Sequence, residues 1–139
     1  MIVLYTHSNN RSFRNALEWF KTKDIPIKVR KIRKANSITK QELLHILSLT
    51  EKGFEDILSS KSGIYNKLRI DSQNFSTNEL LNLIMENPSL LRTPLITEKK
   101  KLLIGYNDTE IRCFVPKRNR YSILYAYYNS EKNMNSLMR

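Results

Sequence analysis

The feature that most constrains the fold is an amphipathic segment close to the N-terminus. Its apolar residues recur at the i, i+3, i+4 and i+7 spacing of a helix with one buried stripe, namely Phe13, Ala16, Leu17 and Phe20. An apolar run at residues 2–5 precedes it and reads as a strand. Residues 27–32 alternate apolar and basic side chains, which is the pattern of a strand with one buried face. We therefore expect a strand, a helix and a second strand whose outer face is entirely positive.

Two capping boxes predict where helices begin in the middle of the chain. Thr39 stands three residues before Glu42, and Ser76 stands three residues before Glu79. In such a pair the hydroxyl accepts from one backbone N–H while the carboxylate accepts from another, so two helix-end donors are satisfied. The helix that opens at Ser76 should stop before Pro88, because the residue before a proline is biased away from helical backbone.

The segments between and after these helices are expected to be short elements. Residues 54–58 and 64–70 have helical patterns, so residues 35–90 are predicted to form a mostly helical lobe. Two strands are expected near residues 95–97 and 102–104, and a short helix capped by Asn107 should follow.

The composition limits the functional classes that the chain can belong to. With 139 residues and 40% hydrophobic residues it can form one domain with a sound core. It has no apolar run of eighteen residues and no signal-peptide pattern, so we expect a cytoplasmic protein without a membrane partner.

The cysteine and histidine content excludes a disulfide within the chain and argues against a metal site. Cys113 is the single cysteine of the chain, and His7 and His45 are far apart in sequence. We expect Cys113 to be a small buried hydrophobe, with a sensing thiol as the alternative. No metal and no cofactor are predicted.

The charge is strongly basic, at +11 from 24 Lys and Arg against 13 Asp and Glu. The excess forms three clusters: Lys28, Arg30, Lys31, Arg33 and Lys34; then residues 99–101; then Lys117, Arg118 and Arg120. Such a surface attracts polyanions, and DNA phosphate near a promoter is the candidate partner. The alternative is a solvated basic face without a partner.

Several segments together resemble a known family. They are residues 1–6, Ile25 with Pro26, residues 49–53, residues 91–96 and residues 105–116. In this order and at these separations they are similar to the Spx regulators, in the arsenate-reductase-like branch of thioredoxin-fold proteins, over about residues 1–120. The resemblance implies an α/β, thioredoxin-like mixed sheet flanked by helices, with an inserted helical lobe. The implied core comprises residues 1–34 and 91–120, the lobe residues 35–90, and a C-terminal helix and flexible tail residues 121–139.

The resemblance also implies a partner. Spx-type proteins bind the C-terminal domain of the RNA polymerase α subunit and change which promoters are used. Many of them carry a Cys-x-x-Cys redox switch after the first strand, and the two switch positions correspond here to Asn10 and Phe13. The implied function is a non-enzymatic, redox-insensitive transcription regulator.

The family's site residues can be placed on this sequence. The resemblance implies polymerase contacts at Ser48, Thr50, Glu51, Gly53 and Lys61, although Ser48 and Gly63 stand where relatives often carry a basic side chain. It implies a vestigial redox and oxyanion loop at Asn10, Phe13, Arg92 and Pro94. The basic cluster of Lys117, Arg118 and Arg120 provides the candidate DNA phosphate contacts. For Gly53 the alternatives are a left-handed helix C-cap or a close backbone approach.

Other functions stay open at this point. One is an arsenate-reductase-like or thiol-dependent enzyme using Cys113, and a less favoured one is a serine–histidine pair built from His7 with Ser8 or Ser12. The missing loop cysteines argue against the first, so no catalytic residue is predicted. Another is a degenerate paralogue that competes for polymerase or for a proteolytic adaptor. A small anion held between the first helix and Arg92 is compatible with all of these readings.

Overall fold

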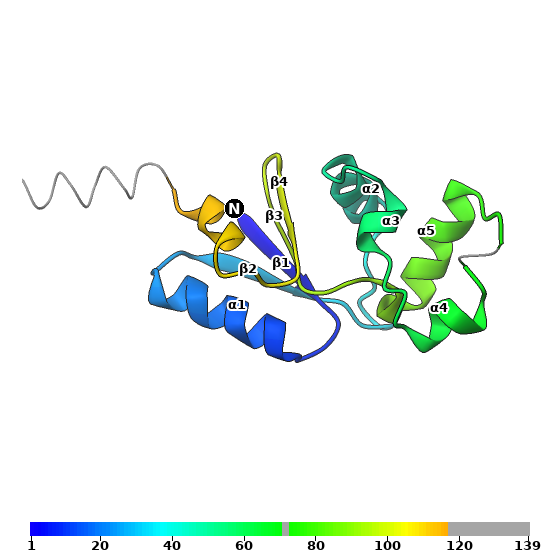
Figure 1. Cartoon of the computed structure of the whole chain (residues 1–139), viewed down its shortest axis with the longest axis horizontal. Coiled ribbons are helices and arrows are strands. Elements are labelled where there is room, and N and C mark those ends of the chain that lie inside the picture. The colour runs from blue at the N-terminus through cyan, green and yellow to red at the C-terminus, as the bar shows by residue number, and fades with distance from the viewer. Residues whose placement is uncertain (71–72, 117–139) are drawn as a thin grey trace, which may run out of the picture. The chain divides into compact units, whose positions relative to one another are not determined.

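A computed structural model describes residues 1–70 and 73–116. The chain divides into two compact units, Met1–Asn107 and Asp108–Arg139. The first unit contains a four-stranded sheet made of β1 (Ile2–Thr6), β2 (Ile27–Lys31), β3 (Leu95–Glu98) and β4 (Lys101–Ile104), in the order β2-β1-β3-β4 (Figure 1). Strand β1 runs parallel to β2 and antiparallel to β3, and β3 pairs antiparallel with β4. The mixed sheet confirms the predicted α/β class.

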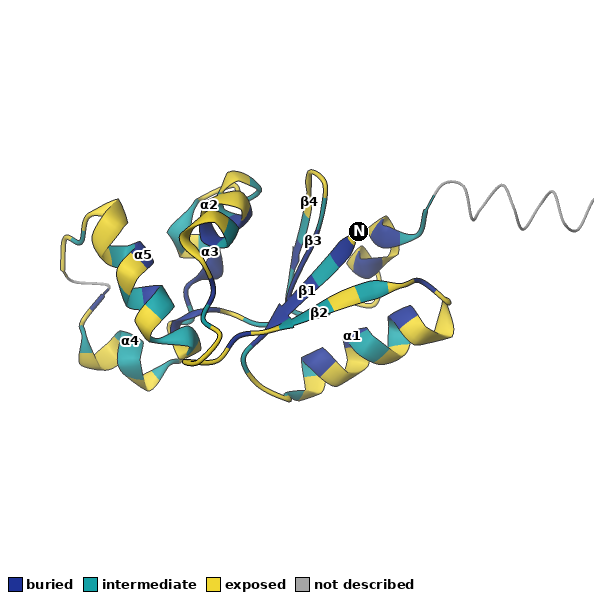
Figure 2. Cartoon of the chain, turned by 180° about the vertical axis from the view of Figure 1, so that it is seen from behind, coloured by how far each residue is buried: buried dark blue, intermediate teal, exposed yellow. Residues whose placement is uncertain are grey.

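Helix α1 (Arg11–Thr22) follows β1 directly and packs through the predicted stripe. Phe13, Ala16 and Phe20 are buried, and Leu17 is half-buried. Figure 2 shows buried positions on one side of α1 and exposed positions on the other. The Asn10 side chain caps the helix by accepting a hydrogen bond of 2.8 Å from the Phe13 backbone N–H.

Four further helices lie together, apart from α1 (Figure 1). They are α2 (Lys40–Ser48), α3 (Phe54–Ile57), α4 (Gly63–Lys67) and α5 (Thr77–Glu86), and the 3-10 helix η1 (Pro88–Leu90) follows α5. Both predicted capping boxes are present, at Thr39 with Glu42 and at Ser76 with Glu79, and α5 stops before Pro88 as expected.

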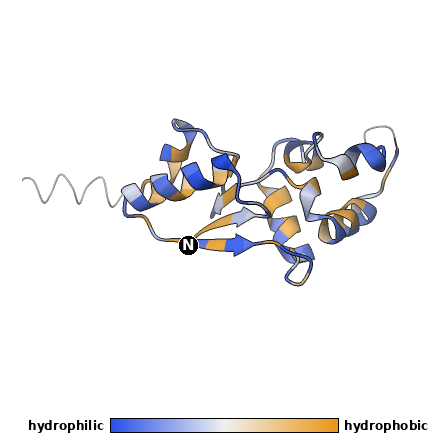
Figure 3. Ribbon diagram, turned by 90° about the horizontal axis from the view of Figure 1, so that it is seen from below, coloured by the Kyte–Doolittle hydropathy of each residue, from blue (hydrophilic) through white to orange (hydrophobic). Residues whose placement is uncertain are grey.

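The helices pack around one apolar cluster. Figure 3 shows hydrophobic and hydrophilic sectors on the same helices, as expected of helices with one buried face. The cluster reaches the sheet, since Tyr5 of β1 and Leu95 of β3 belong to it. Its other buried members are Ile32, Ile38, Leu43, Ile46, Ile57, Leu58, Ile70, Leu81, Ile84, Leu90 and Leu91. The division into a core and an inserted lobe at residues 35–90 stays a prediction.

An ion pair joins the second strand to the first of these helices. Arg30 Nε lies 3.1 Å from Glu42 Oε2, and Arg30 Nη2 lies 3.2 Å from Glu42 Oε1. Arg30 also donates to the carbonyl oxygens of Lys31, Asn36 and Ser37. The prediction of an entirely positive outer face on β2 is therefore wrong at Arg30, whose charge is neutralised within the fold.

The second unit is described for residues 108–116. It contains the 3-10 helix η2 (Glu110–Phe114), with Thr109 rather than the predicted Asn107 at the N-cap position. Ile111 and Phe114 are buried, whereas Cys113 is exposed. Residues i and i+3 eclipse each other in a 3-10 helix, so Ile111 and Phe114 share one face and Cys113 lies off it. The prediction of a buried Cys113 is therefore wrong.

Candidate functional site

The loop after β1 is held by two side chains that reach far along the chain. His7 Nε2 lies 2.9 Å from the carbonyl oxygen of Leu91, and because a carbonyl oxygen only accepts, Nε2 carries the proton of that bond. Asn10 Nδ2 donates to the carbonyl oxygen of Thr93 at 3.4 Å. The His7 ring is thus bonded to a backbone carbonyl rather than to Ser8 or Ser12, the suggested serine partners.

The segment opposite this loop contains Arg92 and a cis Thr93–Pro94 peptide bond. The Arg92 backbone N–H donates to the carbonyl oxygen of Ile57 at 2.8 Å, and Arg92 Nε donates to that of Leu58 at 3.0 Å. Pro94 is buried and Arg92 is exposed. The arginine predicted for the vestigial loop therefore also fixes the end of α3.

These groups line a cavity of about 450 Å³, which we call the polar cavity. Its lining residues are His7, Asn10, Ser59, Ser60, Lys61, Ser89, Leu91, Arg92 and Thr93. The structure thus brings together Asn10 and Arg92, predicted for the vestigial loop, and Lys61, predicted for the polymerase contact. Phe13 and Pro94 do not line it. Sequence reasoning missed Ser59 and Ser89, because their approach depends on the pairing of Leu58 with Leu91.

The chemistry of the polar cavity suits an anion. It contains two cationic side chains, three serine hydroxyls and no carboxylate or thiol among its lining residues. A guanidinium and an ammonium with hydroxyl donors provide charge-assisted hydrogen bonds to an oxyanion. The cavity can therefore hold an anion, but its lining offers no thiolate nucleophile.

The second predicted site is the turn between α2 and α3. Thr50 Oγ1 donates to the carbonyl oxygen of Leu47 at 2.6 Å and accepts from the Gly53 backbone N–H at 3.0 Å. Asp56 Oδ2 accepts from the backbone N–H groups of Glu51 and Lys52, each at 3.0 Å. The turn is thus fixed from both ends. Asp56 was missed by sequence reasoning, although a carboxylate at the third residue of a helix commonly accepts from backbone N–H groups before the helix.

Gly53 is neither the helix C-cap nor the point of close backbone approach that were suggested for it. Helix α2 ends with Leu49 at its C-cap, so Gly53 does not close that helix and instead precedes α3. A Cβ atom added at Gly53 would meet no atom within 4 Å, so no backbone approaches it closely. Its backbone has φ of 67° and ψ of −132°, a region that side chains strongly disfavour, so the conformation is what requires glycine.

The surface beside this turn carries both charge and apolar area. We call Leu44, Ser48, Glu51 and Lys52 the turn surface, since all four are exposed. Leu44 is 45% exposed and lies one helical turn before Ser48, on the same face of α2. Ser48 Oγ donates to the His45 carbonyl oxygen at 2.5 Å. Leu44 was not predicted as a site residue.

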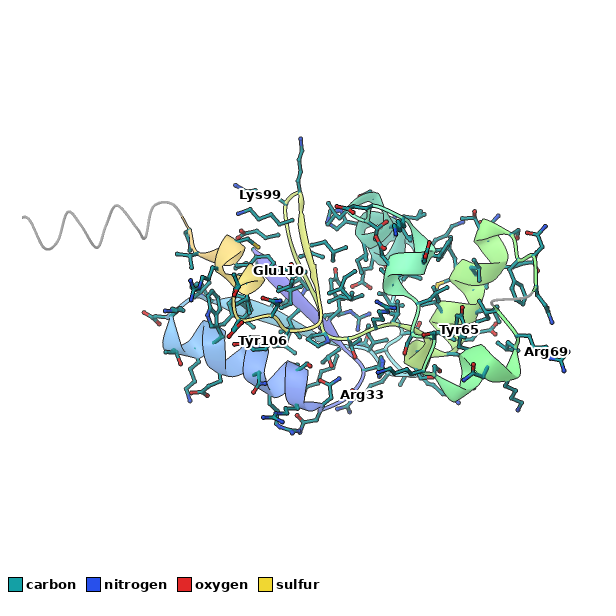
Figure 4. The ribbon with its side chains drawn as sticks, viewed as in Figure 1. Arg33, Tyr65, Arg69, Lys99, Tyr106 and Glu110 are labelled. Atoms are coloured by element: carbon teal, nitrogen blue, oxygen red, sulfur yellow. The ribbon has the colours of Figure 1, made fainter. Side chains whose placement is uncertain are left out.

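The basic clusters are only partly available for a polyanion. Lys28, Lys31, Arg33 and Lys34 are exposed, as are Lys99, Lys100 and Lys101 around the turn of the β3–β4 hairpin, where Figure 4 labels Lys99. Lys117, Arg118 and Arg120 lie outside the described residues, as does the predicted tail at residues 121–139.

The described residues, 1–70 and 73–116, contain neither a candidate metal site nor a candidate membrane-spanning helix. They contain no group of three or more His, Cys, Asp or Glu side chains that could hold a metal ion. None of their helices is long and apolar enough to cross a membrane.

Comparison with solved structures supports the fold. A putative ArsC family related protein from Bacteroides fragilis superposes with a TM-score of 0.68 at 18% identity, covering 80% of this chain and 94% of that one. A putative arsenate reductase from Yersinia pestis superposes with a TM-score of 0.67 at 19% identity, covering 76% of this chain and 92% of that one. At these identities the likeness shows the shared thioredoxin-like fold alone.

Comparison with known sequences is more specific. Residues 5–114 match the ArsC family. The chain is 43% identical over 120 residues to the global transcriptional regulator Spx of Streptococcus pneumoniae strain R6, covering 86% of this chain and 90% of that protein. It is 42% identical over 120 residues to the global transcriptional regulator Spx 1 of Lactococcus lactis, covering 86% and 93%. The chain therefore belongs to the ArsC family and, within it, to the Spx proteins.

Proposed function

We propose that this protein is a non-enzymatic, cytoplasmic transcription regulator that binds the C-terminal domain of the RNA polymerase α subunit. The observation that carries the proposal is the identity of 43% over 120 residues with a global transcriptional regulator. The contacts would come from the turn surface, from Thr50 and Gly53, and from Lys61. Promoter DNA would meet the exposed basic residues as part of the polymerase complex, with Lys117, Arg118 and Arg120 as predicted phosphate contacts.

The geometry of the turn supports a binding role. Bonds from Thr50 and Asp56 hold the backbone of residues 50–53, so Glu51 and Lys52 project from a fixed loop. A preorganised surface loses less conformational entropy on association than a flexible one. The exposed Leu44 adds apolar area beside the charged residues, as is typical of protein contacts.

We further propose that binding is insensitive to oxidants. Cys113 is the single cysteine, so no disulfide can form within the chain. The two loop positions have structural uses instead, because Asn10 caps α1 and Phe13 is buried. Affinity should therefore agree within error in diamide and in dithiothreitol. A reproducible tenfold difference, about 1.4 kcal/mol, would contradict this part.

The central test is titration calorimetry with the purified α C-terminal domain. Wild type should bind, and Gly53→Arg should abolish binding by combining bulk with a backbone that disfavours side chains. Gly53→Ala separates the two effects, since it carries the backbone strain without the bulk. No association of folded wild type at tens of micromolar would overturn the proposal.

Two charge changes provide an independent check on the location of the contact. Ser48→Arg and Gly63→Arg introduce cations at exposed positions where relatives often carry them. If the partner's surface is acidic, each should strengthen binding by up to about 1 kcal/mol and steepen its dependence on salt. Lys23→Gln, an exposed change at the end of α1, serves as the control that should leave affinity unchanged.

The polar cavity favours a second, compatible role, the binding of a small oxyanion without turnover. Its two cations and three serines lie beside a helix N-terminus capped by Asn10. Phosphate or sulfate should perturb the amide resonances of Ser60, Lys61 and Arg92, and Arg92→Gln should weaken that binding. Competition for polymerase or for a proteolytic adaptor, without direct regulation of any gene, is the remaining alternative. Competition for polymerase predicts α-domain binding, whereas competition for an adaptor predicts adaptor binding without it.

A further inference from the structure

A second cavity lies between α1 and the edge strand β2, and His7 lines both this cavity and the polar cavity. It has a volume of about 600 Å³. Its lining residues are Thr6, His7, Ser8, Asn9, Phe13, Leu17, Val29, Lys31, Ile32 and Arg33. Cavities that bind small molecules typically measure about 300–1,000 Å³. We call this one the edge cavity, because β2 pairs with β1 alone in the sheet.

Part of the edge cavity is apolar and continuous with the protein core. Phe13 and Ile32 are only 6% and 2% exposed, and Leu17 and Val29 are half-buried. These four side chains come from one face of α1 and from the region of β2. Leu17 and Val29 provide most of the accessible apolar surface, and a ligand body placed against them would leave water, which favours binding in proportion to the area covered.

The other part of the cavity is cationic and lacks a counter-charge. Lys31 and Arg33 are exposed, and Figure 4 labels Arg33 close to the loop that joins β1 to α1. No Asp or Glu lines the cavity, and within residues 1–70 and 73–116 neither cation forms an ion pair. Arg30 differs, since Glu42 neutralises it. Lys31 and Arg33 are therefore positioned to attract an anionic group.

The Thr6 hydroxyl is already bonded within the loop. The Thr6 hydroxyl donates to the Ser8 carbonyl oxygen at 2.6 Å and accepts from the Ser8 backbone N–H at 3.3 Å. A highly polar ligand, such as a sugar, would have the apolar wall of Leu17 and Val29 against one of its sides. The lining thus favours a ligand with an apolar body and one charged end.

We propose that the edge cavity binds small amphipathic monocarboxylates, such as medium-chain fatty acids. The hydrocarbon chain packs against Phe13, Leu17, Val29 and Ile32, and the carboxylate lies between Lys31 and Arg33. Arginine and lysine both form charge-assisted hydrogen bonds with carboxylates. His7 lines both cavities, but none of the residues proposed for the polymerase contact lines the edge cavity, so this site does not depend on that contact.

Titration calorimetry with the full-length protein tests the proposal, with sodium octanoate as the probe. Octanoate should bind saturably with one site per chain. The uncharged analogue 1-octanol should bind at least tenfold more weakly, and acetate, which lacks the apolar body, should give no signal. Absence of saturable octanoate binding up to about 10 mM, or equal affinities for octanoate and 1-octanol, would overturn the proposal.

Matched variants locate the charged end of the site. The double variant Lys31→Gln with Arg33→Gln should weaken octanoate at least tenfold. The control, Lys28→Gln with Lys34→Gln, removes the same charge from exposed neighbours that do not line the cavity, and it should bind as wild type does. Equal loss in both variants would mean that net charge alone attracts the ligand, and the proposed site would be wrong.

One further variant tests the apolar wall. Leu17→Trp adds bulk inside the edge cavity without changing charge, so it should abolish octanoate binding while circular dichroism stays that of wild type. Unchanged octanoate affinity in folded Leu17→Trp would contradict the proposal. If that variant does not fold, the two double variants decide, since all four of their positions are exposed.

Discussion

Arg30 and Glu42 meet in a two-pronged ion pair, with one hydrogen bond of 3.1 Å and one of 3.2 Å, that joins β2 to the first turn of α2. Glu42 also completes the capping box of α2, because its Oε1 accepts a hydrogen bond of 2.9 Å from the Thr39 backbone N–H. Burial by itself raises the pKa of Glu42, but hydrogen bonds from Arg30 and Thr39 and the Arg30 charge outweigh it, so the pKa is lowered. The carboxylate form of Glu42 therefore stabilises the fold.

The first prediction concerns this pair. Glu42→Gln keeps an acceptor for the cap but removes the charge, so it should lower the free energy of unfolding by about 1–2 kcal/mol. Glu79→Gln is the matched control, since Glu79 has the same capping-box position in α5 and no ion pair within the described residues. Glu79→Gln should lower the free energy of unfolding, measured by urea denaturation, by less than half as much as Glu42→Gln does. Equal losses would mean that the cap, and not the ion pair, matters.

The same variant has a predictable pH dependence. Because the folded-state pKa of Glu42 is lowered, its stabilising contribution is complete above the unfolded value, near 4.5, and is lost as pH falls through the folded value. The stability gap between wild type and Glu42→Gln should be constant from about pH 6 to 8 and should shrink below about pH 4.5. A gap that widens in acid would contradict the assignment.

The second prediction uses two glycines that differ in backbone conformation. Gly53 has φ of 67°, whereas Gly63 does not have a left-handed φ, and neither is crowded. Gly53→Ala should therefore destabilise the protein by about 1–2 kcal/mol, while Gly63→Ala at the start of α4 should be neutral or slightly stabilising. Thermal unfolding of the two variants measures the difference. Similar melting temperatures for both would show that the turn relaxes to accept a side chain.

The third prediction concerns the buried aromatic ring of α1. Phe13 is 6% exposed, so Phe13→Ala should cost about 3 kcal/mol through lost burial and a residual cavity. Phe75→Ala, at a half-buried phenylalanine, should cost about half as much. Chemical denaturation of both variants provides the comparison, and a Phe13→Ala protein as stable as wild type would mean that the ring contributes nothing to the core.

The fourth prediction concerns the cap of the same helix. Asn10→Ala removes the acceptor of the Phe13 N–H bond and should cost about 1 kcal/mol. Asn10→Ser retains an N-cap acceptor but cannot reach Thr93 in the way that the amide does, so it should recover most of this stability. If serine is no better than alanine, the contact with Thr93 is the more important one.

The fifth prediction concerns the accessibility of Cys113. Because this side chain is exposed, it should react with a chromogenic disulfide reagent in the native protein. The reaction rate in the native protein should lie within about tenfold of the rate in denaturant. A buried thiol would instead react more slowly by a factor of roughly the equilibrium constant of unfolding, because it reacts only when the protein unfolds. Strong protection in the native state would contradict the exposed position.

Local patterns in the sequence predicted most of the elements. Helix α1 and the two capping boxes depend on residues within one or two turns of each other, so periodicity and spacing were sufficient to place them. The role of Arg30 could not be predicted in this way, because its partner lies on another element. Cys113 was misplaced because its exposure depends on which face of a short 3-10 helix is buried, and a single turn has no periodicity to read.

The candidate site was predictable only in part. Asn10, Arg92 and Lys61 were placed by resemblance to a family, but nothing in the sequence indicated that they line one cavity. The edge cavity combines residues from a loop, a helix and a strand, and Lys31 and Arg33 had been assigned only to a general basic cluster. Sites that depend on long-range packing are therefore the part that the structure adds.

The bonds from His7 to Leu91, from Asn10 to Thr93 and from Arg92 to Leu58 connect residues 84, 83 and 34 positions apart. Closing a loop of chain has an entropic cost that grows slowly with its length, and contacts within the sheet and the helices offset this cost together with these bonds. The polar cavity therefore exists only where these distant segments of the chain have been brought together. A chain in which these segments are apart lacks the cavity, so the proposed anion binding would distinguish the folded protein from partly folded chains.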